Sequence, residues 1–233
     1  MRNKNFATGD MRGDWNQRAR QDFRHAVYSP TSGEQDDESF WASGVREARF
    51  LAALLDLDIS IPLRIAELGC GAGRLLLPLS KQYPQHRFIG LDISDEMVRL
   101  GREHGSDQRN LTYEMSGAEH LPLQDESIDA LFSAHVLMHV PKRFVPIMIR
   151  EFRRTLRPGG QIILQLPSAK GGKRLLQALL GRDRDPKDTY HRRYYTNGQV
   201  FRLLSSQEFS GICVTQGFPT TRDRWFSARR NNA

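Results

Sequence analysis

The sequence predicts an α/β, Rossmann-like fold with a mostly parallel seven-stranded sheet and helices on both of its faces. A short apolar segment, residues 64–68, leads into three glycines at alternate positions and then into a helical segment. Short apolar segments go on alternating with helical ones over residues 87–166, which indicates βαβ units. The last two apolar segments, 212–216 and 224–228, lie close together in the chain. They predict an antiparallel strand near the C-terminal end.

Length and composition fit one domain with a sizeable core. The chain has 233 residues, of which 39% are hydrophobic. We divide it into an N-terminal helical cap integral to the fold, residues 1–60, and a core, residues 61–233, with a lid-like insertion at about 167–195. No window approaches the ~18 consecutive apolar residues of a membrane-spanning helix. The N-terminus has no apolar run, and the two cysteines form no paired motif, so we expect a cytoplasmic location.

The spacing of apolar residues predicts each element in turn. Spacings of three and four indicate cap helices over residues 14–27 and 38–57. Core helices are predicted at 74–82, 94–105, 144–156 and 196–206, and the other core strands at 87–91, 111–115, 128–134 and 161–166. Pro84 ends one helix, Ser94 N-caps the next, and RPGG at 157–160 forms a turn. Right-handed crossovers then place a ligand at the carboxyl ends of the strands.

The turn after the first strand, AELGCGAGR at 66–74, is suited to hold a ligand. Gly69, Gly71 and Gly73 allow a sharp bend and a close approach of the backbone to a ligand. The N–H groups at the start of the following helix then face that ligand. The spacing is G-x-G-x-G, whereas a dinucleotide site has G-x-G-x-x-G. Glu67, two residues before the first glycine, favours a cationic ligand over a pyrophosphate.

An acidic residue ends the second predicted strand. Asp92 comes 19 residues after Gly73, at the carboxyl edge of the sheet beside the glycine turn. A carboxylate there can accept both hydroxyls of a ribose. Its alternative role is a helix N-cap, which Ser94 already supplies. Alone, Asp92 fits a nicotinamide dinucleotide and S-adenosylmethionine (SAM) equally well.

Three linked stretches resemble the class I SAM-dependent methyltransferases, and within them the methyltransferase type 11 group. The glycine turn resembles motif I. GAEHLPLQDESIDALFSAHVLMHV, at 117–140, resembles the stretch around motif II, where the family typically reads Gly-Asp-Ala-Glu, Leu-Pro-Phe, an acidic turn and a strand. RTLRPGGQIIL, at 154–164, resembles the family's final helix-to-strand turn. The resemblance runs from about residue 64 to 166, and more loosely to the end of the chain.

The resemblance implies SAM as the cofactor, S-adenosylhomocysteine as the product, and a set of cofactor-binding residues. These are Glu67, Gly69, Gly71, Gly73, Asp92, Ile93, Ala118, Glu119 and His135. One position departs from the family, because the aspartate that often holds the adenine amino group is Gly117 here. The adenine would then be held by the Ala118 backbone N–H with Glu119 nearby. Helices before the core often cover the cofactor in this family, which makes cover candidates of Trp15, Arg18, Tyr28 and Trp41.

Two histidines follow the fourth predicted strand. His135 and His139 are four residues apart and share a face of a helical turn. By resemblance, the His135 position lines the cofactor mainly through its backbone. His139 is the better catalytic candidate, as a general base, because an imidazole titrates near neutral pH; a histidine packed against the sheet is the alternative. No third ligand stands out, so we expect no metal.

The distribution of charge bears on the methyl acceptor. Residues 150–233 hold 17 Lys and Arg against 6 Asp and Glu, whereas residues 1–149 hold 17 against 21. A basic C-terminal portion favours anionic partners. We therefore predict methyl transfer to an oxygen or nitrogen of a small anionic molecule, attracted by Arg192 and Arg193. A second polar-aromatic cluster could line the substrate side, namely Tyr190, His191, Tyr194 and Tyr195.

Two other functions stay open at this point. A nucleic-acid methyltransferase would use the basic C-terminal portion, but the chain lacks a D/N-P-P-Y/F block in which an aromatic stacks on a flipped base. A non-catalytic SAM-binding module that regulates a partner is compatible with the departure at Gly117. A dehydrogenase is disfavoured by the glycine spacing and by Glu67.

Overall fold

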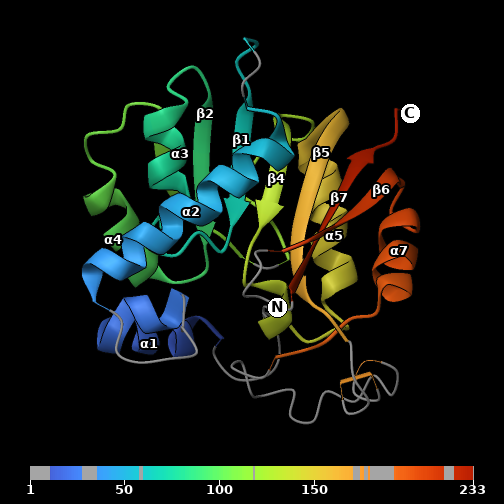
Figure 1. Ribbon diagram of the computed structural model, residues 1–233, viewed down its shortest axis with the longest axis horizontal. Helices are drawn as coiled ribbons and strands as arrows, with labels where there is room; N and C mark the ends of the chain where they lie inside the picture. Colours follow the sequence, from blue (N-terminus) through green and yellow to red (C-terminus); the bar gives the residue numbers. More distant parts are fainter. Residues whose placement is uncertain are drawn as a thin grey trace, which may run out of the picture.

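The computed structural model describes residues 11–27, 36–57, 60–117, 119–169, 174–175, 178, 192–217 and 223–232. These residues form a seven-stranded sheet in the order β3-β2-β1-β4-β5-β7-β6 (Figure 1). The strands are β1 (Arg64–Leu68), β2 (Arg87–Asp92), β3 (Leu111–Met115), β4 (Ile128–Ser133), β5 (Leu156–Pro167), β6 (Phe209–Gln216) and β7 (Asp223–Arg230). The first five are parallel, and β7 runs antiparallel to both of its neighbours. The predicted fold class is confirmed.

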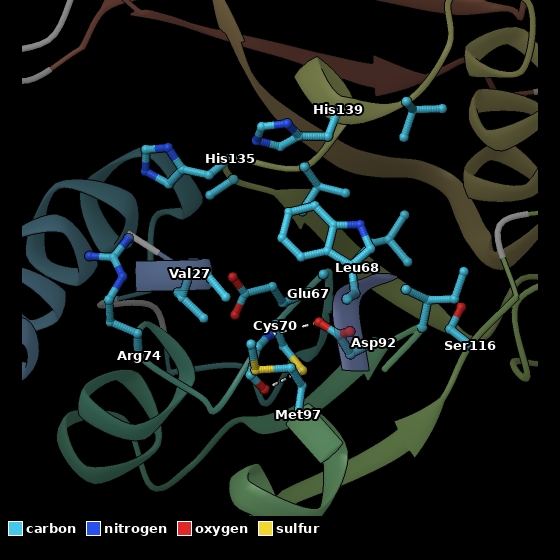
Figure 2. A pocket seen from close by; sticks show the side chains of 18 of the residues that line it. Val27, Glu67, Leu68, Cys70, Arg74, Asp92, Met97, Ser116, His135 and His139 are labelled. Atoms are coloured by element: carbon cyan, nitrogen blue, oxygen red, sulfur yellow. Dashed lines mark hydrogen bonds between the residues drawn. The ribbon is translucent and has the colours of Figure 1, made fainter. Parts of the chain in front are cut away.

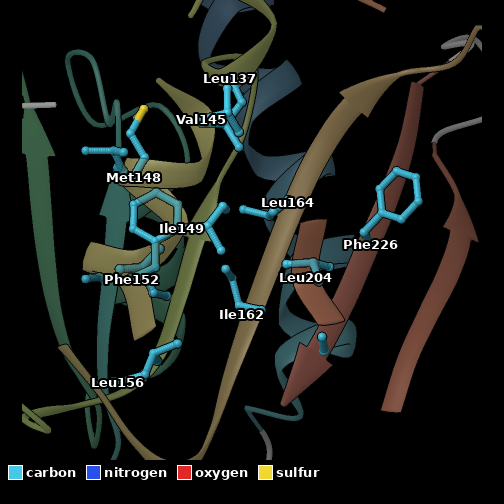
Figure 3. Packing of buried hydrophobic residues seen from close by; sticks show 14 of the residues in the cluster. Leu137, Val145, Met148, Ile149, Phe152, Leu156, Ile162, Leu164, Leu204 and Phe226 are labelled. Carbon is cyan, nitrogen blue, oxygen red and sulfur yellow. The ribbon is translucent and has the colours of Figure 1, made fainter. Parts of the chain in front are cut away.

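Helices cover both faces of this sheet. They are α1 (Met11–Val27), α2 (Asp37–Leu55), α3 (Leu76–Gln82), α4 (Asp95–His104), the 3-10 helix η1 (Leu137–His139), α5 (Val145–Thr155) and α7 (Asn197–Ser205). Successive residues of a strand point to opposite faces. Ile65 therefore packs in the cluster that includes α2 and α3, whereas Ala66 packs in the cluster that includes α5 and α7. Figure 3 shows the second cluster, in which Ile149 and Phe152 of α5 face Ile162 of β5.

Several element boundaries differ from the predicted ones. Helix α1 begins at Met11 rather than at residue 14, and non-helical backbone at Asp22 divides it. The Asp22 carboxylate accepts the Arg24 N–H, so it restarts the helix after the break. Strand β5 begins at Leu156, because Leu156 pairs with Ile128 before an irregularity in the register. The RPGG sequence predicted as a turn therefore lies within a strand. The predicted N-cap Ser94 is confirmed, since its hydroxyl accepts the Met97 N–H.

Helix α1 packs at the end of the sheet where the glycine turn lies, and α2 runs from that end across one face of the sheet (Figure 1). Helix α2 crosses so close to this turn that a Cβ at Gly44 would lie 2.3 Å from the carbonyl oxygen of Arg74. Val27, the last residue of α1, lies directly against Gly71, where a Cβ would meet its Cγ2 at 2.6 Å. Both cap helices therefore contact the turn itself.

The ring of one buried tyrosine, Tyr113, leaves no space for a side chain at several glycine positions of the core. Tyr113 of β3 is buried, and a Cβ at Gly101 of α4 would lie 2.7 Å from its ring. A Cβ at Gly90 of β2 would lie 2.6 Å from the same ring, and one at Gly73 would lie 2.1 Å from its hydroxyl. The ring thus fills the space that these three glycines leave.

We expect Gly101→Ala to destabilise the protein relative to Gly198→Ala. Both glycines lie in helices, where alanine has the higher propensity, but nothing lies within 4 Å of a Cβ at Gly198. Overpacking should lower the free energy of unfolding of Gly101→Ala by about 1–3 kcal/mol against this control. Urea unfolding monitored by circular dichroism measures the difference. In a Tyr113→Leu background, the difference in unfolding free energy between the two alanine variants should become smaller. Equal stability of the two variants in the wild-type background would contradict close packing of Tyr113 against Gly101.

Candidate functional site

A pocket lies at the carboxyl ends of β1, β2 and β4, and α1 covers it (Figure 2). Its walls come from α1, the glycine turn, the end of β2 with the start of α4, the residues that follow β3, the loop after β4 with η1, and α5. The lining residues are Met11, Trp15, Ala26, Val27, Glu67, Leu68, Gly69, Cys70, Gly71, Arg74, Leu75, Asp92, Ile93, Met97, Ser116, Gly117, Ala134, His135, Val136, His139, Val140 and Met148. Most of the predicted cofactor residues are therefore brought together here.

The glycine turn adopts the bent backbone that its sequence predicts. Gly69 and Gly71 have φ values of +74° and +54°, which L side chains rarely adopt. The N–H groups of Gly69 and Cys70 both donate to the carbonyl of Leu91, which holds the turn against β2. Gly73 has φ of +89° but faces Tyr113 rather than the pocket. Its role here is close packing under the turn.

Asp92 lies at the end of β2, next to the turn. One carboxylate oxygen accepts the Gly71 N–H at 2.9 Å, and the other accepts the Ser94 N–H at 2.9 Å. Burial raises the pKa of Asp92, and the backbone hydrogen bonds from Ser94, Gly71 and Ile93 oppose that rise. The aspartate thus joins the glycine turn to the start of α4 while it lines the pocket.

Glu67 is the least satisfied polar group of the pocket. Its side chain is only 2% exposed, and its Oε2 has no hydrogen-bond partner among the described residues. Burial raises the pKa of Glu67 well above its ordinary value; Arg74 opposes this, while Glu47 and Asp92 add to it. A buried carboxyl group without a partner is costly. A cationic ligand in the pocket would relieve that cost.

The far end of the pocket is mainly apolar. Ile93 and Met97 line it together with Ser116 and Gly117. A Cβ at Gly117 would have its nearest neighbour, the His120 carbonyl oxygen, at 3.5 Å, so the position has room for a side chain. Ala118 lies outside the described residues. Glu119 is exposed and does not line the pocket.

His135 and His139 lie on one side of the pocket in Figure 2, across from Asp92 and Met97. The ring of Trp15 meets that of His139 edge-on, at 5.4 Å between centroids. Burial, followed by the charges of Arg192, His135, Arg193 and Arg18, lowers the pKa of His139 to about 3. Its imidazole is therefore neutral at neutral pH.

Sequence reasoning missed an ion-pair network behind the pocket. Glu47 of α2 accepts from Arg74 Nη2 at 2.6 Å, and its other oxygen lies 3.1 Å from His135 Nε2. Burial raises the pKa of Glu47, but the charges and hydrogen bonds of His135 and Arg74 outweigh it and hold that pKa at about 2. Glu47 lies four residues before the buried Leu51, so an acid on an otherwise apolar helix face was the available signal.

The remaining predicted residues either line the pocket, pack away from it, or lie outside the described residues. Trp15 lines the pocket, and the Arg18 guanidinium lies over its ring at 5.7 Å. Trp41 packs instead against Phe40 and His104, away from the pocket lining. Of the predicted aromatic cluster, Tyr194 and Tyr195 carry cations over their rings but do not line the pocket. Tyr28, Tyr190 and His191 lie outside the described residues.

Comparison with known proteins agrees with the family that the sequence resembles. Residues 66–164 match the family described as Methyltransferase domain. This part of the chain is a methyltransferase domain. The match starts and ends within two residues of the stretch, 64 to 166, over which the sequence resembles the type 11 group. The matched stretch agrees with the predicted family, and the described residues share the fold of SAM-dependent methyltransferases of known structure.

Curated relatives match the methyltransferase domain at about 30% identity. A malonyl-acyl-carrier-protein O-methyltransferase of Xylella fastidiosa is 32% identical over 120 residues, which cover 52% of this chain and 40% of the relative. A trans-aconitate 2-methyltransferase of Azoarcus sp. is 30% identical over 139 residues, 59% of this chain and 51% of the relative. The chain thus spans about half or less of the length of these relatives.

Solved structures share the fold over a longer stretch. Magnesium protoporphyrin IX methyltransferase of Synechocystis PCC 6803, with bound S-adenosylhomocysteine, has a TM-score of 0.69 at 21% identity. The alignment covers 94% of this chain and 98% of that one. Within the described ranges, no helix is both long and apolar enough to cross a membrane. No three His, Cys, Asp or Glu side chains gather as a metal site among those same residues.

Proposed function

We propose that this protein transfers the methyl group of SAM to an oxygen or nitrogen atom of a small anionic molecule. The observation that carries the proposal is the cationic surrounding of His139, which lines the pocket. Arg193 donates Nη1 to the His139 carbonyl at 2.9 Å. Burial lowers the pKa of the His139 imidazole, and the charges of Arg192, Arg193 and Arg18 lower it further. An anionic acceptor beside His139 would be attracted by the same charges.

The residues of the pocket fit SAM at three points. The unpaired Oε2 of Glu67 suits a positively charged ligand, because SAM carries a sulfonium and an α-ammonium group. The Asp92 carboxylate, beside the glycine turn, suits the two ribose hydroxyls. Ile93 and Met97 supply apolar surface for a flat base. When bound, SAM supplies an electrophilic methyl group, and the protein has to align a nucleophile with it and exclude water.

The state of His139 favours one class of acceptor. A neutral imidazole can accept a proton, but a pKa of about 3 makes it a weak base. A carboxylate is already deprotonated at neutral pH, so it needs no base. A hydroxyl or ammonium group would need one. We therefore favour a carboxylate oxygen as the nucleophile, with His139 helping to orient it.

Two relatives agree with this choice. The malonyl group and trans-aconitate, after which those two relatives are named, both carry carboxylates. The likeness covers 52% and 59% of this chain in the two cases. Carboxylate methylation is thus supported from the arginines of this chain and from the chemistry of its relatives.

A panel of acceptors tests the proposal. The protein is incubated with SAM and with malonate, trans-aconitate, their neutral methyl esters, or transfer RNA, and S-adenosylhomocysteine is measured. Turnover should be at least tenfold faster with the free carboxylates than with the esters. Arg192→Gln should lower it about tenfold and leave the SAM dissociation constant unchanged. Turnover of RNA alone would favour a nucleic-acid methyltransferase, and SAM binding without turnover of any acceptor would favour a regulatory module.

The departure at Gly117 gives a gain-of-function prediction. Because a side chain fits at this position without strained backbone, Gly117→Asp should place a carboxylate where it can accept from the adenine amino group. One such hydrogen bond contributes about 1.5–3 kcal/mol. We expect Gly117→Asp to bind SAM about tenfold more tightly by isothermal titration, whereas Gly117→Leu should weaken binding. An unchanged or weaker affinity in Gly117→Asp would contradict the placement of the adenine.

A further inference from the structure

We propose that Gln165 and Asp223 form a buried positioning pair that joins the cofactor side of the pocket to Arg192 on the acceptor side. This inference rests on the proposed function. Neither residue lines the pocket, so both would act through the residues that they hold. The pair is formed across neighbouring antiparallel strands, because Gln165 belongs to β5 and Asp223 begins β7.

The hydrogen bonds of Gln165 give its amide a single orientation. The side chain is 1% exposed. Its Oε1 accepts the His135 N–H at 2.7 Å, and its Nε2 donates to Asp223 Oδ2 at 3.4 Å. An ionised carboxylate only accepts hydrogen bonds. The amide nitrogen must therefore face Asp223, which turns the amide oxygen toward His135.

His135 needs such an anchor. Its φ is +60°, a conformation that strains a non-glycine residue and persists only when its surroundings impose it. The backbone N–H is held by Gln165, and the imidazole is held by Glu47. The loop after β4 is thus fixed from both sides, on the sheet and on the cap helix α2.

The other end of the pair reaches the acceptor side. Arg192 Nη2 lies 3.4 Å from Asp223 Oδ2, and Arg192 Nε lies 3.3 Å from Met138 Sδ. The Arg192 side chain is 52% exposed, so it can still meet an anion from solvent. The next residue, Arg193, donates its backbone N–H to the Met138 carbonyl and Nη1 to the His139 carbonyl. The chain segment that begins at Arg192 is therefore docked on η1.

A polar path consequently links His135, which lines the pocket, to Arg192, which lies outside the pocket lining. It runs from Glu47 through His135, Gln165 and Asp223 to Arg192. If the pair is a positioning device, a change at Gln165 should disturb both the SAM-binding loop and the segment at Arg192. The effect of a change at Gln165 should also depend on which of the two residues donates the hydrogen bond. A side chain that only fills space would show no such dependence.

A swap of the pair tests this dependence by isothermal titration with SAM. Gln165→Leu and Gln165→Glu should each weaken SAM binding at least tenfold, the first by removing the acceptor and the second by setting two carboxylates together. The double variant Gln165→Glu/Asp223→Asn should recover to within about threefold of the wild type, because the amide then donates from position 223. Gln161→Leu is the matched control, since Gln161 lies on the same strand and donates to the Leu54 carbonyl; its affinity should not change.

Hydrogen exchange gives a second measurement that needs no ligand. In Gln165→Leu, exchange should become at least tenfold faster both in residues 135–140 and in residues 192–196, while α3 should stay protected. The inference is overturned if the double variant binds SAM as weakly as Gln165→Glu, or if only one of the two segments exchanges faster. Failure of the wild type to bind SAM would instead overturn the proposed function, and the exchange result would still decide the role of the pair.

Discussion

Asp92→Ala is expected to weaken SAM binding about 100-fold or more and to leave the fold intact. The carboxylate would accept two ribose hydroxyls, and a hydrogen bond to a charged group contributes about 1.5–3 kcal/mol. Two such bonds correspond to a factor of about 100 at the lower end of that range. Isothermal titration with SAM and with S-adenosylhomocysteine should show the same loss, because the two ligands share the ribose.

The experiment needs a control for the second role of Asp92. This carboxylate also accepts the N–H groups of Gly71 and Ser94, so its removal frees two backbone donors. Circular dichroism should show the same secondary structure for the variant as for the wild type. Asp95→Ala, three residues along, removes an exposed acid of α4 and should bind SAM normally. Wild-type affinity in Asp92→Ala would remove the ribose assignment.

The parts of the site that were predictable are those fixed by local sequence and by parallel topology. The glycine turn bends because its own residues allow positive φ, whatever else packs on it. Asp92 meets this turn because β1 and β2 are parallel neighbours, so that their carboxyl ends lie at one edge. The order strand, turn and helix in the sequence is therefore enough to predict the bend of the glycine turn and the position of Asp92 beside it.

The parts that were not predictable depend on contacts between distant segments. Glu47 and His135 are 88 residues apart in the chain and meet only because α2 packs across the turn. The rotation of each cap helix likewise decides that Trp15 of α1 lines the pocket while Trp41 of α2 packs on His104. Strand β5 starts early because Leu156 finds a partner in Ile128, which overrides the turn chemistry of Arg157 and the glycines after it. Periodicity alone does not contain this information.

Glu67→Gln is expected to make the protein more stable above neutral pH and to weaken its binding of SAM. The pKa of Glu67 is raised above its ordinary value of 4.5 in the folded protein, so the folded state holds a proton that the unfolded state loses first. Stability therefore falls as pH rises from 4.5 through the raised value. Glutamine keeps the shape without the ionisation. At pH 8 the Tm of Glu67→Gln should exceed that of the wild type, by about 2–4 °C for each kcal/mol of difference in unfolding free energy. Near pH 4 the two Tm values should be equal.

The same substitution should weaken SAM binding, by about tenfold or more, because the ionised carboxyl group is the partner of a cationic ligand in a buried site. Binding a cation favours the ionised form, so the wild type should release a proton as SAM binds, and its affinity should rise with pH. Titrations in two buffers of different ionisation enthalpy measure that proton. Glu67→Gln should release none and should lose the pH dependence. Glu114→Gln, on β3 and outside the pocket lining, should behave as the wild type. If Glu67→Gln still releases a proton as SAM binds, another group loses that proton. That group, and not Glu67, would then be the anionic partner of the cofactor.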